Sequence, residues 1–225
     1  MDEIVTKQQL SDSLKLMAVC FYEPEPALFE EEKVFQNLSN LFEGFCPAAC
    51  ISTENMHRAI YSSSQEELQI AHADLFIGPF ELKASPYGST YLEEKGMVMG
   101  DSTMEVLKHY RKAGLEIDIK QPPDHIAIEL EFLSYLCALE VEALRDGDVK
   151  KAAELQADQK LFLGKFILPW MPDFIKNIRA GTENTFYRCL VDCFETFLQQ
   201  LELQNNPADM YVLDGMKTDA DATTH

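Results

Sequence analysis

The spacing of apolar residues constrains this chain most, because they recur at steps of three and four along almost its whole length. Such spacing places apolar side chains on one face of an α-helix. The longest stripe consists of Ile126, Leu130, Leu133, Cys137, Val141 and Leu144. A second stripe lies beside it and consists of Ile128, Phe132, Leu136 and Leu139. This helix is therefore apolar over a wide arc, and we predict that it is central.

The chain has 225 residues, which is enough for one domain with a sizeable core. Alternating strand patterns are nearly absent. We therefore expect an all-α fold, a single bundle-like domain of about nine or ten helices over residues 1–204 with one long loop rich in aromatic residues and proline. Residues 205–225 contain an Asn-Asn-Pro break and are expected to form a flexible C-terminal tail.

Two helix boundaries can be predicted from capping residues. Asp124 follows Pro122-Pro123 and is expected to be the N-cap of the central helix, because its carboxylate can accept an unpaired amide of the first turn. Asp101-Ser102 is expected to open a helix that runs to about Ala113, with Gly114 as its stop.

Charge and hydropathy exclude several classes of protein. Lys plus Arg is 19 and Asp plus Glu is 38, so the net charge is −19. An acidic chain is a poor ligand for nucleic acid, because binding there depends on cations that neutralise phosphates. The sequence begins without a cationic region followed by an apolar run, and no stretch approaches the roughly 18 apolar residues of a membrane span. We expect a soluble, cytoplasmic protein without stable membrane insertion.

The six cysteines are expected to be core residues rather than metal ligands. Cys46 and Cys50, like Cys189 and Cys193, are separated by three residues, which is not the CxxC spacing of zinc ribbons or thioredoxin-like sites. Cysteines within apolar helical stripes behave as small hydrophobic residues. The five histidines are scattered and form no HxxxH or HExxH motif, so no metal site is expected.

The segment from Gly78 to Gly100 differs from the rest of the chain. Its glycines and prolines break helices, yet it contains the large apolar residues Phe80, Tyr87, Tyr91, Leu92 and Met97. Loops normally cross the surface. Aromatic residues in such a loop therefore either fill the core or line a binding surface.

The order of four motifs resembles a known family. These are Leu75-Phe76-Ile77-Gly78-Pro79, Ser85-Pro86-Tyr87-Gly88, Gly100-Asp101-Ser102-Thr103, and Pro123-Asp124-His125 followed by Glu129 and Phe132. Over residues 68–145 the chain resembles the TorD/DmsD-like chaperones, which mature molybdenum-containing oxidoreductases of anaerobic respiration. The Pro-Asp-His-x-x-x-Glu-x-x-Phe stretch is the most specific part of this resemblance.

The resemblance implies an all-α cytoplasmic chaperone that binds the twin-arginine signal peptide of an apo-oxidoreductase and holds the enzyme back from export. The molybdopterin guanine dinucleotide would belong to the client, weak GTP binding has been proposed for some members, and members are monomers or domain-swapped dimers. Carried over by position, the peptide-binding residues would be Leu75, Phe76, Pro86, Tyr87, Tyr91, Pro123, Asp124 and His125. His72 occupies a position that is often aromatic in the family, and we include it in the site.

These residue types suit a leader with two guanidinium groups followed by an apolar run. Aromatic and proline faces can bury aliphatic side chains, and tyrosine rings also attract Arg. We expect an open rim formed by Pro86, Tyr87 and Tyr91 above the start of the central helix, with Asp124 pairing a leader Arg.

Structural interpretations compete with this one. Asp124 can serve chiefly as an N-cap, His125 can bond between two loops, and either Leu75 or Phe76 can be core. Glu129 and Glu131 are expected on a solvated face at the helix start.

Two other functions, hydrolysis and nucleotide binding, compete with the chaperone interpretation. A hydrolase using His125, Asp124 and Ser85 or Ser89 is disfavoured, because neighbouring side chains on a helix diverge and no GxSxG elbow is present. No GxxxxGK[ST] or GxGxxG motif supports nucleotide binding. The alternatives retained are an acidic helical interaction module and a guanine-nucleotide-binding assembly factor without signal-peptide specificity.

Overall fold

The computed structural model describes residues 3–78, 82–94, 96, 98–116 and 121–205. These residues form α1 Glu3–Val19, α2 Pro26–Glu31, α3 Val34–Phe45, α4 Pro47–Ser62, α5 Gln65–His72, α6 Ser89–Leu92, α7 Asp101–Lys112, α8 Ile126–Arg145, α9 Val149–Phe162, α10 Met171–Gly181 and α11 Thr185–Asn205. Two π-helical turns, Ala73–Ile77 and Leu163–Ile167, continue α5 and α9.

The all-α prediction is confirmed, since the described residues contain helices and no strand. They hold eleven α-helices, more than the nine or ten expected, because α2 and α6 have only six and four residues and are too short to show an apolar repeat. The predicted tail, 205–225, lies outside the described residues except for Asn205, the last residue of α11.

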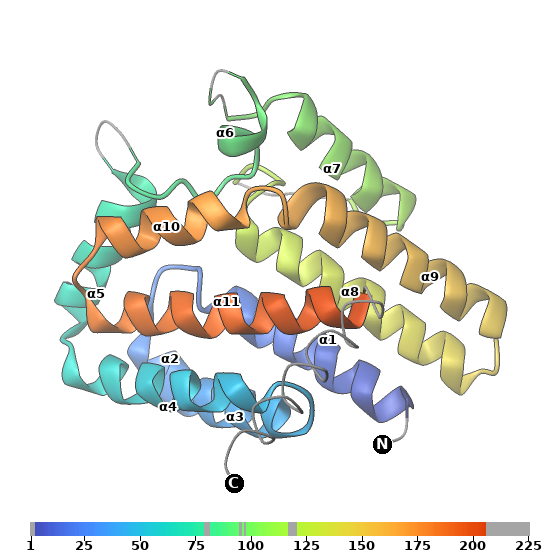
Figure 1. Ribbon diagram of the computed structural model, residues 1–225, viewed down its shortest axis with the longest axis horizontal. Coiled ribbons are helices and arrows are strands. Elements are labelled where there is room, and N and C mark those ends of the chain that lie inside the picture. Colours follow the sequence, from blue (N-terminus) through green and yellow to red (C-terminus); the bar gives the residue numbers. More distant parts are fainter. Residues whose placement is uncertain (1–2, 79–81, 95, 97, 117–120, 206–225) are drawn as a thin grey trace, which may run out of the picture.

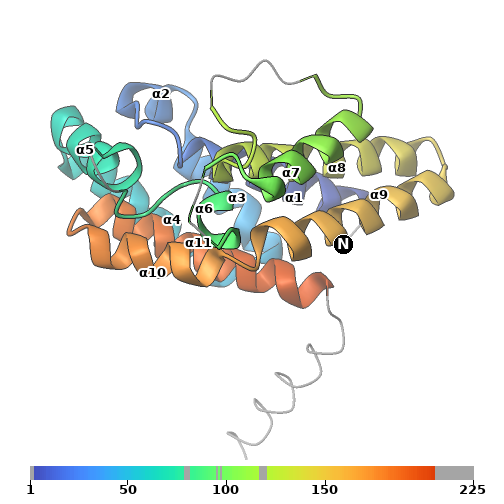
Figure 2. The ribbon, with the colours of Figure 1, turned by 90° about the horizontal axis from the view of Figure 1, so that it is seen from above.

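The helix α8 is central, as its two apolar stripes predicted (Figure 1). It runs between α1 and α9 and packs against both. A second group of helices pairs α4 with α3 on one side and with α11 on the other. Figure 2 shows α10 and α11 along one side of the molecule and α6 and α7 beside the start of α8.

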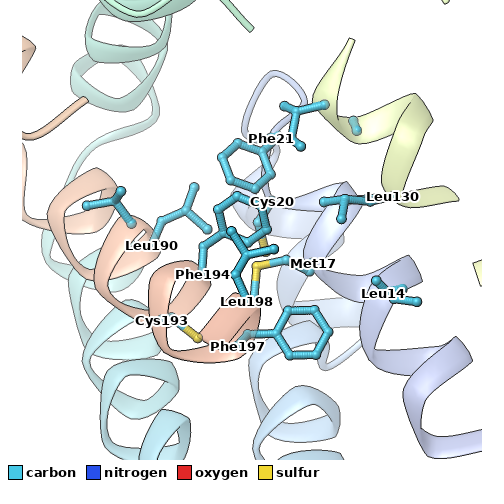
Figure 3. Close-up of a cluster of buried hydrophobic side chains, with 14 of the residues drawn as sticks. Leu14, Met17, Cys20, Phe21, Leu130, Leu190, Cys193, Phe194, Phe197 and Leu198 are labelled. Carbon is cyan, nitrogen blue, oxygen red and sulfur yellow. The ribbon is translucent and has the colours of Figure 1, made fainter. Parts of the chain in front are cut away.

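A cluster of buried side chains joins the two groups of helices (Figure 3). The rings of Phe21 and Phe194 meet edge to face with centroids 4.9 Å apart, and Leu130 of α8 completes the cluster. A large apolar side chain gains about 1.5–3 kcal/mol when it is fully buried. This contact between the end of α1 and α11 therefore anchors the chain segment that follows α1.

The expected role of the cysteines as core residues fits most of them. Cys20, Cys46, Cys137 and Cys193 are buried, while Cys50 and Cys189 are half-buried. Burial raises the pKa of the Cys137 and Cys193 thiols to about 12, which keeps them protonated and unreactive. Among the described residues, no group of three or more His, Cys, Asp or Glu side chains is placed to hold a metal ion.

Local capping explains where several helices begin. Ser64 and Glu67 form a capping box at α5, and the Asp148 carboxylate accepts the amide of Lys151 at 3.0 Å at the start of α9. The predicted helix from Asp101 is confirmed as α7, and Gly114 follows it with a φ of +81°. Within the described ranges, no helix is long and apolar enough to cross a membrane.

The turn between α2 and α3 carries backbone strain at an exposed residue. Lys33 has a φ of +50°, in the left-handed region that costs roughly 1–2 kcal/mol for a residue with a Cβ. We predict that Lys33→Gly stabilises the protein by about 0.5 kcal/mol, because relief of strain outweighs the entropy of an added glycine.

The matched control is Gly114→Ala. Its added Cβ meets no atom within 4 Å, so backbone strain alone should destabilise this variant, by about 1 kcal/mol. Urea denaturation measures both changes. A destabilised Lys33→Gly variant would contradict the strain argument.

Candidate functional site

The long loop between Gly78 and α7 is attached to the start of α8 by its backbone. The amide of Gly88 donates to the carbonyl of Asp124 at 2.9 Å, and the amide of Ile126 donates to the carbonyl of Pro86 at 2.8 Å. These two bonds form an isolated antiparallel bridge between Tyr87 and His125. Four of the nine predicted site residues therefore come together at one joint: Pro86, Tyr87, Asp124 and His125. Pro86 and Asp124 are 38 positions apart along the chain.

Asp124 caps a helix, but a different one from that predicted. Its Oδ2 accepts the amide of Ser89 at 2.8 Å, at the first residue of α6, whereas the N-cap of α8 is His125. The carboxylate lies one residue too early to reach the first turn of α8. Asp124 is only 1% exposed, and its Oδ1 has no hydrogen-bond partner among the described residues. It is therefore closed to a peptide Arg in this conformation.

His125 is a buried helix cap. Its Nδ1 accepts the amide of Ala127 at 3.2 Å, so this nitrogen bonds the first turn of its own helix. The ring stacks on Tyr22 with centroids 5.8 Å apart and meets the edge of Tyr87 at 5.4 Å. Burial lowers the pKa of His125 to about 4, so the imidazole is neutral at pH 7.

Leu75 and Phe76 are both core residues, where only one was expected to be. They lie in the π-helical turn that continues α5, and the amide of Ala84 donates to the carbonyl of Leu75 at 2.9 Å. Phe76 meets the edges of Tyr187 and His72 at 5.7 and 5.1 Å. His72 is buried as well, and burial lowers its pKa.

The predicted open rim is wrong. Pro86 and Pro123 are buried, and Tyr87 and Tyr91 are half-buried. The ring of Tyr91 stacks over Trp170 at 5.2 Å, and its hydroxyl donates to the carbonyl of Ser85 at 3.0 Å. Burial raises the pKa of Tyr91 to about 12. The aromatic loop folds inward because Trp170, at the start of α10, provides a partner for it.

Glu129 is buried, although it was predicted to lie on a solvated face. It is 1% exposed, and its Oε2 has no hydrogen-bond partner among the described residues. Burial, with a further contribution from Asp124, raises its pKa well above the usual value. Glu131, two residues on, is exposed as predicted.

The loop reaches Glu129 and Trp170 because residue 88 is glycine. A Cβ there would lie 3.1 Å from Nε1 of Trp170 and 3.7 Å from Oε1 of Glu129. The indole N–H of Trp170 donates a hydrogen bond to the carbonyl of Phe166 at 2.6 Å. This close approach leaves little room for a side chain at residue 88.

Tyr22 and Trp170 belong to the joint, although neither was predicted to be a site residue. Trp170 is the single tryptophan of the chain and lies between two prolines, a signal that could have identified it. Tyr22 lies in an ordinary connection after α1 and offered no comparable signal. Chemically, the joint brings together a neutral imidazole, two buried carboxyl groups and the aromatic side chains of Tyr22, Tyr87, Tyr91 and Trp170, an arrangement suited to holding a loop in place.

The buried carboxyl group of Glu129 predicts a pH effect. Its raised pKa means that the folded state prefers the protonated form, so its contribution to stability is present at low pH and is lost as pH rises through the folded pKa. We predict that Glu129→Gln gains stability relative to the original chain between pH 5 and 8, by up to about 1.4 kcal/mol per pH unit. Denaturation curves across this range measure the difference, and Glu142→Gln on the exposed face of α8 is the control. Parallel curves for Glu129→Gln and the original chain would contradict this.

The lowered pKa of His125 predicts the opposite dependence of stability on pH. Its folded pKa of about 4 lies below the unfolded value, so stability is present above about pH 6.5 and is lost as pH falls towards 4. Asn is also a good N-cap but does not titrate. We expect the original chain to lose about 2 kcal/mol more than His125→Asn between pH 6.5 and 5. The same denaturation experiment tests this, and an equal loss in both proteins would exclude His125 as the cause.

Comparison with known proteins identifies the family of this chain. The sequence profile of the nitrate reductase delta subunit family matches residues 43–176, which include the joint and all nine predicted site residues. The crystal structure of a proposed redox enzyme maturation protein from Archaeoglobus fulgidus superposes with a TM-score of 0.53 at 25% identity, covering 82% of this chain and 93% of that one.

The curated relatives carry chaperone names. Chaperone protein TorD from Vibrio vulnificus is 28% identical over 136 residues, which cover 60% of this chain and 62% of that protein. TorD from Photobacterium profundum is 28% identical over 178 residues, covering 76% and 80%, and the Tat proofreading chaperone DmsD from Salmonella typhi is 27% identical over 143 residues, covering 63% of each. The chain thus spans somewhat less than two thirds of the Vibrio and Salmonella proteins. These relatives are chaperones rather than enzymes, which supports the expectation of a protein without catalysis. The chain belongs to the nitrate reductase delta subunit family, among its TorD/DmsD-like members.

Proposed function

We propose that this protein is a cytoplasmic chaperone that binds the twin-arginine signal peptide of a molybdenum-containing oxidoreductase and holds the apoenzyme for cofactor insertion before export. The observation that carries this proposal is the family match over residues 43–176, together with relatives named as chaperones and as a Tat proofreading chaperone. In this proposal the molybdopterin guanine dinucleotide belongs to the client. Weak guanine-nucleotide binding stays a prediction.

The charge of the chain supports a cationic partner. A net charge of −19 attracts a leader that carries two adjacent arginines and speeds its encounter with the protein. Salt screens this attraction beyond about 8 Å at physiological ionic strength. Affinity must therefore come mainly from direct contacts, and charge contributes mainly to the association rate.

Burial limits which of the predicted residues can contact a peptide. Of the nine predicted peptide-binding residues, only Tyr87 and Tyr91 are half-buried rather than buried. In this proposal Pro86, Asp124 and His125 act indirectly, because they hold the loop and the start of α6 against the start of α8. The remaining four residues, His72, Leu75, Phe76 and Pro123, are buried in the core. An acidic interaction module without signal-peptide specificity is the alternative, and it predicts that the two leader arginines are dispensable.

A peptide titration tests the proposed function. We predict that a leader peptide with two adjacent arginines and a following apolar run binds with a Kd of about 1 μM. Replacement of both arginines by glutamine should weaken binding at least about tenfold, because guanidinium–carboxylate contacts are lost. Isothermal titration calorimetry measures both affinities. Equal affinities would favour the acidic interaction module, and no binding by either peptide would refute the proposal.

Light scattering in the same samples distinguishes a monomer from a domain-swapped dimer.

A further inference from the structure

An apolar strip of exposed side chains continues from the half-buried tyrosines of the loop. It lies at the end of α6, in the connection that follows and in the first turn of α7. Its members are between 37% and 57% exposed, and they are Leu92, Val98, Met99 and Met104. Figure 2 shows α6 between α7 and α10. Because Leu92 directly follows Tyr91, the strip is continuous with the peptide contact proposed above.

The side chain of Glu93 ties the two ends of this strip together. Its Oε1 accepts the amide of Ser102 at 2.8 Å and the hydroxyl of Ser102 at 2.7 Å. Gly100 is the N-cap residue of α7, and a Cβ there would lie 2.5 Å from the carboxyl carbon of Glu93. The glycine therefore leaves room for a carboxylate that caps α7 in its place. This attachment exists before any ligand binds, which reduces the entropic cost of binding.

An exposed carboxylate, that of Asp173, lies near Tyr91 on the side of α10. The ring of Tyr91 stacks over Trp170 and meets the edge of Phe174 with centroids 6.3 Å apart. Asp173 lies between Trp170 and Phe174 in the sequence, in the first turn of α10. Burial raises the pKa of Tyr91, and the nearby charge of Asp173 adds to this shift. No described residue forms a hydrogen bond or ion pair with the Asp173 carboxylate.

Asp173 is better placed to meet a guanidinium group than the carboxyl groups of the joint. Asp124 and Glu129 are each 1% exposed, so an arginine would reach them only after the loop had opened. Asp173 is exposed and needs no such opening. An arginine paired with it would also contact the accessible part of the Tyr91 ring, and both contacts favour a guanidinium.

We propose that Asp173 pairs with a leader arginine beside Tyr91 and that the apolar strip takes the apolar run that follows. This inference rests on the proposed function. It deepens that function by adding contacts on α10 and α7 to Tyr87 and Tyr91, which stay in the site. Methionine side chains adapt to apolar partners of different shape, so Met99 and Met104 suit leaders of different sequence.

Charge favours a cationic leader over a second copy of the chain. A second copy would bring another net charge of −19 to a surface that already exposes Glu94, Asp101 and Asp173. Like charges brought together at an interface cost free energy. The cation Lys165 is already paired with Glu105 of α7.

The test uses the full chain and a fluorescently labelled synthetic peptide, in which two adjacent arginines precede about twelve residues of leucine and alanine. Fluorescence anisotropy gives its Kd. We expect Asp173→Asn to weaken binding about tenfold at low salt and less at high salt, because salt screens the ion pair. We expect Met104→Ser to weaken binding about fivefold at both salt concentrations, because apolar burial is not screened.

A second peptide, in which glutamine replaces both arginines, separates ion pairing from indirect effects. Asp173→Asn should change its affinity less than about twofold, because no guanidinium is left to pair with residue 173. Met104→Ser should still weaken its binding.

Matched controls remove similar groups elsewhere on the surface. Asp146→Asn removes an exposed carboxylate at the end of α8, and Ile51→Ser removes an apolar side chain that is 68% exposed on α4. Both variants should bind the arginine peptide like the original chain. Thermal denaturation verifies that every variant folds.

Several outcomes would overturn the inference while leaving the proposed function in place. If Asp173→Asn binds the arginine peptide like the original chain, the arginine is held elsewhere, and a loss confined to Asp124→Asn would show that the loop opens to admit it. If Met104→Ser binds equally well, the apolar run does not lie on the strip. If the controls lose as much affinity as the site variants, only general charge and apolar exposure matter. If sedimentation shows a dimer that Met104→Ser dissociates, the strip joins two copies.

A different result would overturn the proposed function itself. If the original chain binds neither peptide, the protein is no receptor for such a leader, and the inference fails with it.

Discussion

The backbone bridge between Tyr87 and His125 is the interaction on which the arrangement of the candidate site depends. It attaches the long loop to the first residue of the central helix through two hydrogen bonds. The Asp124 carboxylate extends the attachment to α6 by accepting the amide of Ser89. A loop without strands to pair with needs such partners for its buried amides and carbonyls. The bridge thereby sets where Tyr91 meets Trp170 and where Tyr87 meets His125.

Burial at this joint determines the protonation of its acidic and basic groups. His125 stays neutral because its pKa is lowered to about 4, and Glu129 favours its protonated form because its pKa is raised. Both groups would cost free energy if charged in this position. A site of this kind stabilises a loop and is poorly placed to pair with a mobile cationic ligand.

The helical architecture, the central place of α8 and the start of α7 could be predicted from the amino-acid sequence, because helical spacing and capping are local properties. The motifs also predicted that Pro86, Tyr87, Asp124 and His125 lie close together, as they do in the structure. The exposure of these residues could not be predicted in the same way, because the burial of a loop depends on partners that are distant in the sequence. Tyr91 is covered by Trp170, 79 positions later, and Asp124 reaches α6 instead of α8 because the bridge brings Ser89 to it.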